Sequence, residues 1–250
     1  MAKETVLAIG AHPDDMEQFA GGTLILLKQA GFELTIAALT SGECGSKTLS
    51  PDEIVAKRLE EAKRGAKILG ASYINLGIRD GSVEYNLENA TKLVKLIREI
   101  DPQIIITHPT EDYMTDHWHT GRLVLWAVPE AAHPNFPADT KAPAIKMQPY
   151  TYHTDPQGLT DPDGQIARVN TIVDISEVVE QKLEAFSAHE SQMGFLSSAM
   201  NAVEKTRRWA VTRGEQVRVA YGEGFYQQLH AEYPRKNILV ELLPGKAYTL

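Results

Sequence analysis

The stretch Val6-Leu7-Ala8-Ile9-Gly10-Ala11-His12-Pro13-Asp14-Asp15, near the start of the chain, decides the fold. Residues 6–9 form a continuous apolar run with a β-branched residue at each end, which predicts a short buried strand. Pro13 has a fixed φ and no N–H group to donate to a sheet, so the strand ends before it. The side chains of His12, Asp14 and Asp15 therefore lie at the carboxyl end of a strand, where open α/β sheets bind ligands.

An imidazole and two carboxylates within four residues make a compact set of donors for zinc or a similar divalent metal. The alternative interpretation is that Asp14 and Asp15 only cap the following helix while His12 packs against the turn. A second cluster of histidine and carboxylate residues favours the metal-site interpretation. The segment His108–His119, which follows the apolar run Ile104–Thr107, again concentrates histidine and carboxylate side chains at a strand end.

Apolar runs of strand length alternate with segments of helical periodicity along the chain. The predicted strands are Val6–Ile9, Leu34–Leu39, Tyr73–Leu76, Ile104–Thr107 and Tyr150–Tyr152. The predicted helices are Gly21–Ala30, Pro51–Leu69, Leu87–Ile100, Thr120–Ala131 and about 174–191. Such repeated βα units predict a single α/β domain over residues 1–250, with a Rossmann-like, doubly wound and mostly parallel sheet. A dinucleotide site is not expected, because Gly10-Ala-His-Pro stands where Gly-x-Gly-x-x-Gly would be needed.

Two later regions lack this regularity. Prolines recur at positions 134, 137, 143, 149, 156 and 162, so we predict that residues 132–170 form an irregular segment serving as a pocket wall or a subunit contact. Residues 207–250 carry basic, aromatic and apolar patches without recognisable chemistry.

Composition narrows the class of protein. The 250 residues are 43% hydrophobic and 23% charged, with a formal net charge of −8. These values are typical of a globular protein, and the acidic balance argues against a nucleic-acid partner. No apolar run is long enough for a membrane span and no signal-peptide core follows the first residues, so we expect a cytoplasmic protein. The single cysteine, Cys44, excludes an intrachain disulfide and a thiolate metal cage.

The two ligand-type clusters together resemble the PIG-L/LmbE family, metal-dependent de-N-acetylases of sugar derivatives. Ala11-His12-Pro13-Asp14-Asp15 matches the family signature completely, and the resemblance spans about residues 4–195. It also covers Thr40–Glu43, Arg58-x-x-Glu61, Asp80-Gly81 and Ala188–Gln192. The resemblance implies that His12 and Asp15 bind zinc and that Asp14 is the general base. A later His-Pro-Asp-His segment of the family supplies the third ligand, which implies His117 here.

The match is incomplete in that later segment, which is Met114-Thr115-Asp116-His117 in this chain. The family's first histidine there is thought to stabilise the tetrahedral oxyanion, and the thioether of Met114 cannot. Either another imidazole, from His108, His119 or His189, takes this role, or the reaction differs from the usual deacetylation. We favour His189, because it lies on the buried side of a predicted helix beside Ser191 and Gln192. The alternative is that His189 is a core histidine.

Two further residues are expected to contact substrate. The resemblance implies that Arg58 binds sugar hydroxyls with its planar guanidinium, whereas its position beside a buried helical stripe also fits a rim ion pair with Glu61 or Glu60. Asp80 precedes a glycine at a strand end, which is typical of an ordinary turn, but the resemblance implies an acceptor for a sugar hydroxyl.

The resulting expectation is a zinc-dependent hydrolase that removes an N-acetyl group from a sugar-like small molecule and releases acetate. A hydratase or another lyase with the same metal site, and a non-catalytic sugar-binding module, are the alternatives. Retention of both Asp14 and Asp15 favours hydrolysis. Because relatives include trimers and hexamers, we also expect a homo-oligomer.

Overall fold

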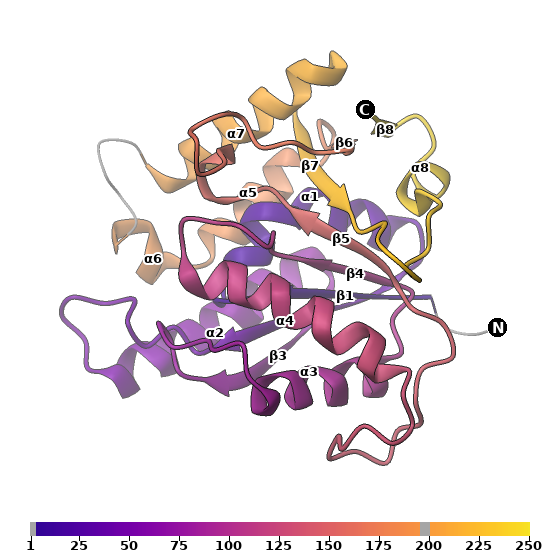
Figure 1. Cartoon of the computed structure of the whole chain (residues 1–250). Coiled ribbons are helices and arrows are strands. Elements are labelled where there is room, and N and C mark those ends of the chain that lie inside the picture. Colours follow the sequence, from indigo (N-terminus) through magenta and orange to yellow (C-terminus); the bar gives the residue numbers. More distant parts are fainter. Residues whose placement is uncertain (1–3, 196–200) are drawn as a thin grey trace.

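A mixed sheet of eight strands runs through the computed structural model, which describes residues 4–195 and 201–250 (Figure 1). Its order is β3-β2-β1-β4-β5-β7-β6-β8. The strands are β1 (Thr5–Gly10), β2 (Glu33–Thr40), β3 (Ala71–Ile78), β4 (Ile104–Thr107), β5 (Tyr150–Thr154), β6 (Thr171–Asp174), β7 (Gly222–Gln227) and β8 (Ala247–Thr249). The first five in spatial order pair in parallel, and the other three extend the sheet antiparallel. The predicted Rossmann-like, mostly parallel fold is confirmed.

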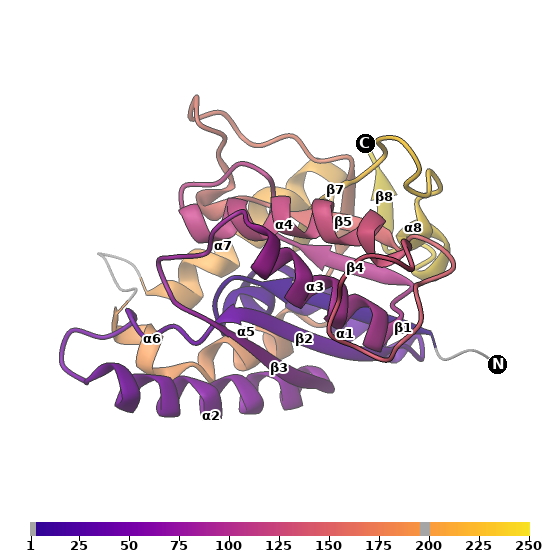
Figure 2. The same ribbon diagram turned by 60° about the horizontal axis from the view of Figure 1, so that its bottom comes forward.

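Helices cover both faces of the parallel strands. They are α1 (Asp15–Gln29), α2 (Pro51–Leu69), α3 (Leu87–Ile100), α4 (Thr115–Ala131), α5 (Val179–Ser187), α6 (Glu190–Phe195), α7 (Ala202–Val217) and α8 (Ile238–Leu242). Figure 2 shows α2 and α4 on opposite faces of the sheet. Alternate side chains of β1 separate accordingly, because successive strand residues point to opposite faces. Val6 and Ala8 pack with α1 and α5, whereas Leu7 and Ile9 pack with α3 and α4.

Local signals placed two helices at the predicted bounds. Ser50 and Glu53 form a capping box at the start of α2, which ends at Gly70 in the left-handed conformation with φ 74°. Such a capping box and a left-handed glycine are strong helix start and stop signals. Asn86 caps α3, whose span Leu87–Ile100 is also as predicted.

The predicted starts of α1 and α4 were wrong, because both helices begin at the ligand-type residues themselves. α1 starts at Asp15 rather than Gly21, and α4 starts at Thr115 rather than Thr120. The glycines of α1 serve packing instead of initiation, since a Cβ on Gly22 would lie 2.6 Å from Ile175. The candidate ligands of α1 and α4 therefore stand in first helical turns.

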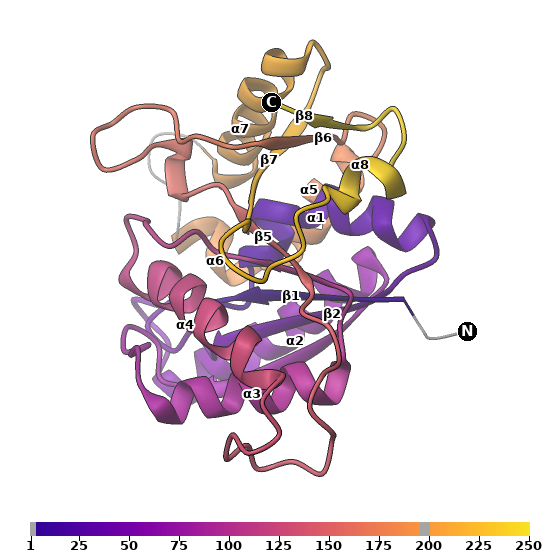
Figure 3. The ribbon, with the colours of Figure 1, turned by 45° about the vertical axis from the view of Figure 1, so that its right-hand side comes forward.

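The C-terminal region is more regular than its sequence suggested. Residues 171–174 form β6, so the predicted helix from about 174 begins only at Val179, and it is interrupted between α5 and α6. The strands β6, β7 and β8 gather with α7 on one side of the molecule (Figure 3). Within residues 4–195 and 201–250, no helix is both long and apolar enough to cross a membrane.

Candidate metal centre

The first and fourth strands place the candidate ligands at one point of the sheet. β2 and β4 lie on either side of β1, so the chain winds in opposite directions from β1, and ligands of open α/β sheets bind at such switch points. His12 follows β1, Asp15 opens α1, and His117 lies in the first turn of α4, close to the end of β4. These three residues, named here the metal-ligand cluster, come together although 105 positions separate His12 from His117.

Donor atoms of the metal-ligand cluster are spaced as a zinc-type ion requires. The His117 Nε2 atom lies 3.3 Å from His12 Nδ1 and 3.3 Å from Asp15 Oδ1, and His12 Nδ1 lies 3.5 Å from Asp15 Oδ2. Zinc bonds of about 2.0–2.2 Å in a tetrahedron put neighbouring donors about 3.3–3.6 Å apart. All three side chains are buried. The donor set and its spacing therefore fit a divalent metal bound by nitrogen and oxygen.

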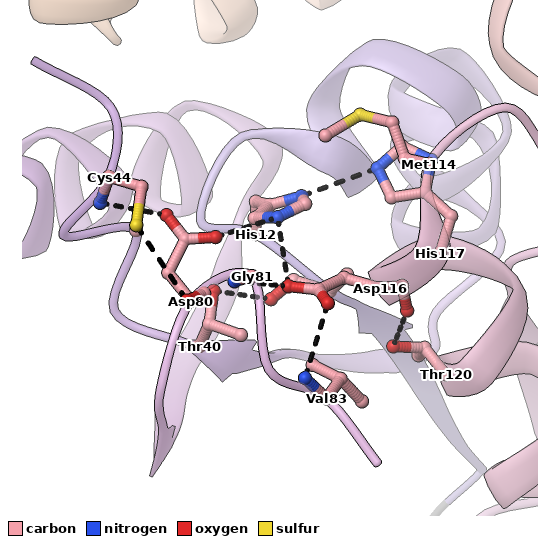
Figure 4. A network of polar contacts seen from close by, with 12 residues as sticks. His12, Thr40, Cys44, Asp80, Gly81, Val83, Met114, Asp116, His117 and Thr120 are labelled. Atoms are coloured by element: carbon pink, nitrogen blue, oxygen red, sulfur yellow. Dashed lines mark hydrogen bonds and ion pairs between the residues drawn. The ribbon is translucent and has the colours of Figure 1, made fainter. Parts of the chain in front are cut away.

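A carboxylate lies close to the second ring nitrogen of each ligand imidazole. His12 Nε2 lies 3.2 Å from Asp80 Oδ1 (Figure 4). His117 Nδ1 lies 3.3 Å from Asp112 Oδ2. Ligand histidines commonly donate their second ring N–H to a carboxylate, which fixes the ring and its tautomer. Asp112 and Asp80 are thus placed to orient the two imidazoles towards the metal.

His12 also belongs to a second group of possible ligands, with Asp80 and Asp116. The oxygens of Asp116 already accept hydrogen bonds from the backbone N–H groups of Gly81, at 2.8 Å, and Val83, at 3.2 Å (Figure 4). Asp80 Oδ2 accepts from the N–H group of Cys44 at 3.0 Å. These carboxylates are committed to loop structure, so the metal-ligand cluster is the better candidate.

His108 is a fourth imidazole at the same point and is completely buried. Its Nε2 atom lies 2.8 Å from Asp15 Oδ2, and its ring stacks on that of His117 with centroids 3.9 Å apart. Burial, together with the neighbouring His117, lowers the pKa of His108. Burial alone would raise the pKa of the Asp15 carboxyl, but the surrounding imidazoles hold it well below its usual range. Asp15 is therefore kept as a carboxylate, the form that binds metals.

Asp14 points away from the helix that it precedes. It occupies the N-cap position of α1 but makes no capping hydrogen bond. Its Oδ1 atom instead accepts from Arg58 Nη2 at 2.7 Å. Asp15 likewise does not cap, because its Oδ2 accepts from the N–H group of His12. The interpretation that these two residues only cap α1 was wrong.

Arg58 is 3% exposed and reaches the site from α2. Besides Asp14, it donates from Nη1 to the Gly42 carbonyl at 3.2 Å. The predicted rim ion pair was wrong, since Glu61 bonds to Ser191 and Glu60 pairs with Lys63. A Cβ at Gly42 would lie 2.2 Å from Arg58 Nη1, and φ there is +72°. Only glycine fits this loop without displacing the guanidinium.

A second glycine allows α4 to approach the end of β4. A Cβ on Gly121 would lie 2.4 Å from the Pro109 carbonyl oxygen and 2.5 Å from that of His108. Those atoms are backbone and cannot yield as a flexible side chain would. Gly121 thus permits the close contact that carries His117, one turn earlier, to the metal-ligand cluster.

The structure places the remaining predicted residues outside the metal-ligand cluster. His119 Nδ1 contacts the Val83 carbonyl. His189 is completely buried, and its Nε2 atom lies 3.4 Å from Glu17 Oε1. Burial alone would lower the pKa of His189, but Glu17 outweighs it and raises that pKa. Met114 lies beside His117 at the start of α4 (Figure 4).

Asp112 and Asp116 were missed as individual site residues, although the sequence placed both in the second cluster. A carboxylate one to five residues from a candidate histidine ligand would have been a usable signal, because such histidines commonly have carboxylate partners. The sequence left open whether Glu43 reaches the site or is an exposed loop carboxylate, and in the structure its Oε1 accepts a hydrogen bond from the N–H group of Asp80.

Comparison with known proteins assigns the chain to a family. The family described as PIG-L, GlcNAc-PI de-N-acetylase, matches residues 7–128. The chain is 35% identical over 199 residues to diacetylchitobiose deacetylase of Thermococcus kodakarensis, covering 75% of this chain and 69% of the relative. This chain belongs to the PIG-L family. The ligands proposed from its signature thus lie in a PIG-L domain.

Two other similar proteins extend the comparison to nearly the whole chain. The solved N,N'-diacetylchitobiose deacetylase from Pyrococcus horikoshii superposes with a TM-score of 0.80 at 27% identity, covering 95% of this chain and 89% of that one. A 4-oxalmesaconate hydratase of Pseudomonas putida is 24% identical over 246 residues, covering 93% of this chain and 91% of the relative. Proteins similar to this PIG-L chain thus carry out two reaction classes.

Proposed function

We propose that this protein is a metal-dependent hydrolase that removes the N-acetyl group of an amino-sugar derivative and releases acetate. The observation that carries the proposal is the metal-ligand cluster in a PIG-L fold, with the Asp14 carboxylate directly beside it. The similarity to a diacetylchitobiose deacetylase supports the amide substrate. A bound metal of the zinc type polarises a carbonyl and makes its water more acidic.

Asp14 is the proposed general base. It is adjacent in sequence to Asp15 and shares the same turn, and its Oδ1 atom is held by Arg58. This ion pair fixes the carboxylate and leaves Oδ2 to accept a proton from the attacking water. The same oxygen then delivers the proton to the nitrogen of the leaving amine, as a general base becomes a general acid in the second half of such a reaction.

Arg58 and Asp80 are proposed to act mainly by positioning. Arg58 holds Asp14, and Asp80 holds the outer nitrogen of His12. Contact between either residue and sugar hydroxyls, as the family resemblance implied, stays a prediction. It is tested by Arg58→Lys, which keeps the charge but loses the fork of donors. A raised KM with unchanged kcat would support contact with the substrate, and a lowered kcat would support positioning of the base.

His189 also stays a prediction as the group that replaces the family's oxyanion donor at Met114. Its ring is buried and faces Glu17, one helical turn after Asp14. The His189→Ala variant decides. A loss of about 10²–10³ in kcat at unchanged metal content would support an oxyanion donor. Unchanged kcat with a lowered melting temperature would support a core histidine.

A hydratase is the second candidate function. Two observations favour it: Met114 replaces the histidine expected of a deacetylase, and a similar chain is a 4-oxalmesaconate hydratase. A hydratase would add water to a carbon–carbon double bond, again with Asp14 moving the proton. It requires no leaving amine.

The test is a paired assay on one protein preparation. Acetate release is measured over N-acetylglucosamine, N,N'-diacetylchitobiose and related N-acetylated glycosides, and water addition is followed over unsaturated dicarboxylic acids. Each assay is run with and without a chelator. Acetate release that the chelator abolishes supports the proposal, whereas water addition without acetate release would replace it with the hydratase.

Three finer statements belong to the proposal. Zinc is the proposed metal, because two imidazoles and one carboxylate are typical catalytic zinc ligands; elemental analysis of protein purified without chelator tests this. A homo-oligomer is proposed from the family resemblance, and light scattering of the purified protein in solution tests it. The cytoplasmic location also stays a prediction, which fractionation of the source cells tests.

A further inference from the structure

A cavity of about 340 Å³ lies between α4, the end of β5 and β7. Cavities of about 300–1,000 Å³ are typical of small-molecule sites. None of its lining residues belongs to the metal-ligand cluster. It is nevertheless close in the chain, because Pro109, which lines it, directly follows His108. The irregular segment around residues 155–169 supplies part of its wall.

The floor of the cavity carries buried polar atoms without hydrogen bonds. His153 is 3% exposed, and its Nδ1 atom donates to the His108 carbonyl at 2.7 Å. Its Nε2 atom has no well-aligned hydrogen bond in the described part of the chain, and its polar neighbour there is the side chain of Gln228, which also lines the cavity. The hydroxyl of Thr154, which also lines the cavity, is buried and unbonded too. Buried polar groups are normally satisfied, so these atoms point to a ligand.

His153 is an acceptor at this place. Burial lowers its pKa, so the ring is neutral near pH 7. Since Nδ1 carries the proton given to the His108 carbonyl, Nε2 presents a lone pair. A matching ligand therefore donates a hydrogen bond there, as a sugar hydroxyl or an amide N–H does.

The rim supplies two opposite charges and an aromatic face. Glu111 and Arg168 line the cavity, both are exposed, and neither forms an ion pair among the residues described. Their charges cancel, which disfavours a strongly charged ligand. Tyr226 is 44% exposed at the same opening. An aromatic ring combined with fixed polar groups suits a hydroxylated ring, whose C–H face packs on the aromatic while its hydroxyls find donors and acceptors.

We propose that this cavity is a second carbohydrate site, which binds one neutral sugar ring with His153 at its floor and Tyr226 at its rim. The choice of a sugar as ligand rests on the proposed function, whereas the cavity and its unbonded groups do not. His153 donates a hydrogen bond to the carbonyl of His108, and His108 in turn contacts Asp15. A sugar bound to His153 is therefore connected to the metal-ligand cluster through His108.

The experiment measures binding of N-acetylglucosamine by saturation-transfer NMR and titration calorimetry. The Asp15→Ala variant is used with chelator, so that binding through the metal is removed. We expect binding to persist in this variant. Adding Tyr226→Ala or Arg168→Ala, both at exposed positions, is expected to weaken it at least tenfold. The matched controls Tyr85→Ala and Arg208→Ala lie outside the cavity and are expected to leave it unchanged.

Two results would overturn the inference: no binding of the sugar to Asp15→Ala, or equal binding with and without the cavity substitutions. Its failure is distinguishable from failure of the proposed function. Acetate release by the wild type without cavity binding removes only the second site. Cavity binding in a protein that releases no acetate removes only the deacetylase, and the sugar site stands.

Discussion

Two buried groups of charged side chains occur in this molecule, and they are built on opposite principles. The metal-ligand cluster gathers one carboxylate and two imidazoles, with His108 beside them. The second group joins the C-terminal strands to α1 and α5. We call it the ion-pair cluster, and its members are Asp155, Lys182, Arg213 and Glu223.

Each charged side chain of the ion-pair cluster has a partner of opposite charge within the cluster. Lys182 Nζ lies 2.7 Å from Glu223 Oε1, and Arg213 reaches both oxygens of Asp155. Glu223 also accepts from the N–H groups of Gly22 and Thr23. Two cations balance two anions, and the remaining oxygens are hydrogen-bonded, as a buried charge requires.

The donor atoms of the metal-ligand cluster are not paired in this way, because their lone pairs point towards one another. Two imidazole nitrogens that face each other at 3.3 Å repel through their lone pairs unless a cation or a shared proton lies between them. The comparison teaches that burial of charge alone does not mark a functional site. A functional site is marked instead by several metal-ligand atoms that point to one place. Each of the following substitutions tests that distinction.

The largest effect is expected for His117→Ala. Removal of one of three ligands is expected to reduce bound metal to near zero and to abolish measurable turnover, because too few donors remain to hold the ion. Metal content and acetate release are measured on the same preparation. His133→Ala, at an exposed histidine, is the control. Full metal content in His117→Ala would move the third ligand to His108.

Asp14→Asn is expected to keep the metal and lose about 10²–10⁴ in kcat, since an amide fills the space but cannot accept a proton. The thermal midpoint is compared alongside, because the variant also weakens the bond to Arg58. Arg58→Lys is the variant to compare with it, because it keeps a positive charge next to an unchanged Asp14 carboxylate. Activity of Asp14→Asn at the wild-type level would remove Asp14 from the mechanism.

Lys182→Met breaks the ion-pair cluster and is expected to act on stability alone. Loss of one partner of a buried pair costs about 3–5 kcal/mol, because the other charge stays buried. Denaturant unfolding measures the loss, and kcat per folded molecule is expected to stay within about twofold. The control is Lys57→Met at an exposed site. A large fall in kcat with unchanged stability would erase the contrast between the two clusters.

His189→Gln is expected to give the smallest effect on stability, and that effect is expected to depend on pH. The pKa of His189 is raised in the folded protein above its usual value of about 6.5. The folded state then binds more protons between these two pKa values, so the stabilisation is complete below about pH 6.5 and is lost as pH rises through the folded pKa. Unfolding of wild type and variant is compared at pH 6 and pH 9 with chelator present. A stability difference independent of pH would show that the ring contributes by packing only.

Much of the fold could be predicted, because its signals are local. The apolar run at residues 6–9 and the isoleucines at 104–106 gave the central parallel strands, and caps at Ser50 and Asn86 gave two helices with their bounds. The antiparallel extension was not predictable in this way. Strands β6 and β8 have only four and three residues, and their pairing joins segments far apart in the chain, which a local pattern does not encode.

The same division applies to the site. By itself the sequence determined that His12, Asp14 and Asp15 share one turn at the end of a strand, since Pro13 ends that strand and three polar residues crowd around it. Only the tertiary structure decided their partners. Arg58 on Asp14, Asp80 behind His12 and Asp112 beside His117 are set by how α2, α4 and the loops pack over the sheet. Such contacts join residues that are distant or on different elements, so they depend on packing and glycine close approaches rather than on periodicity.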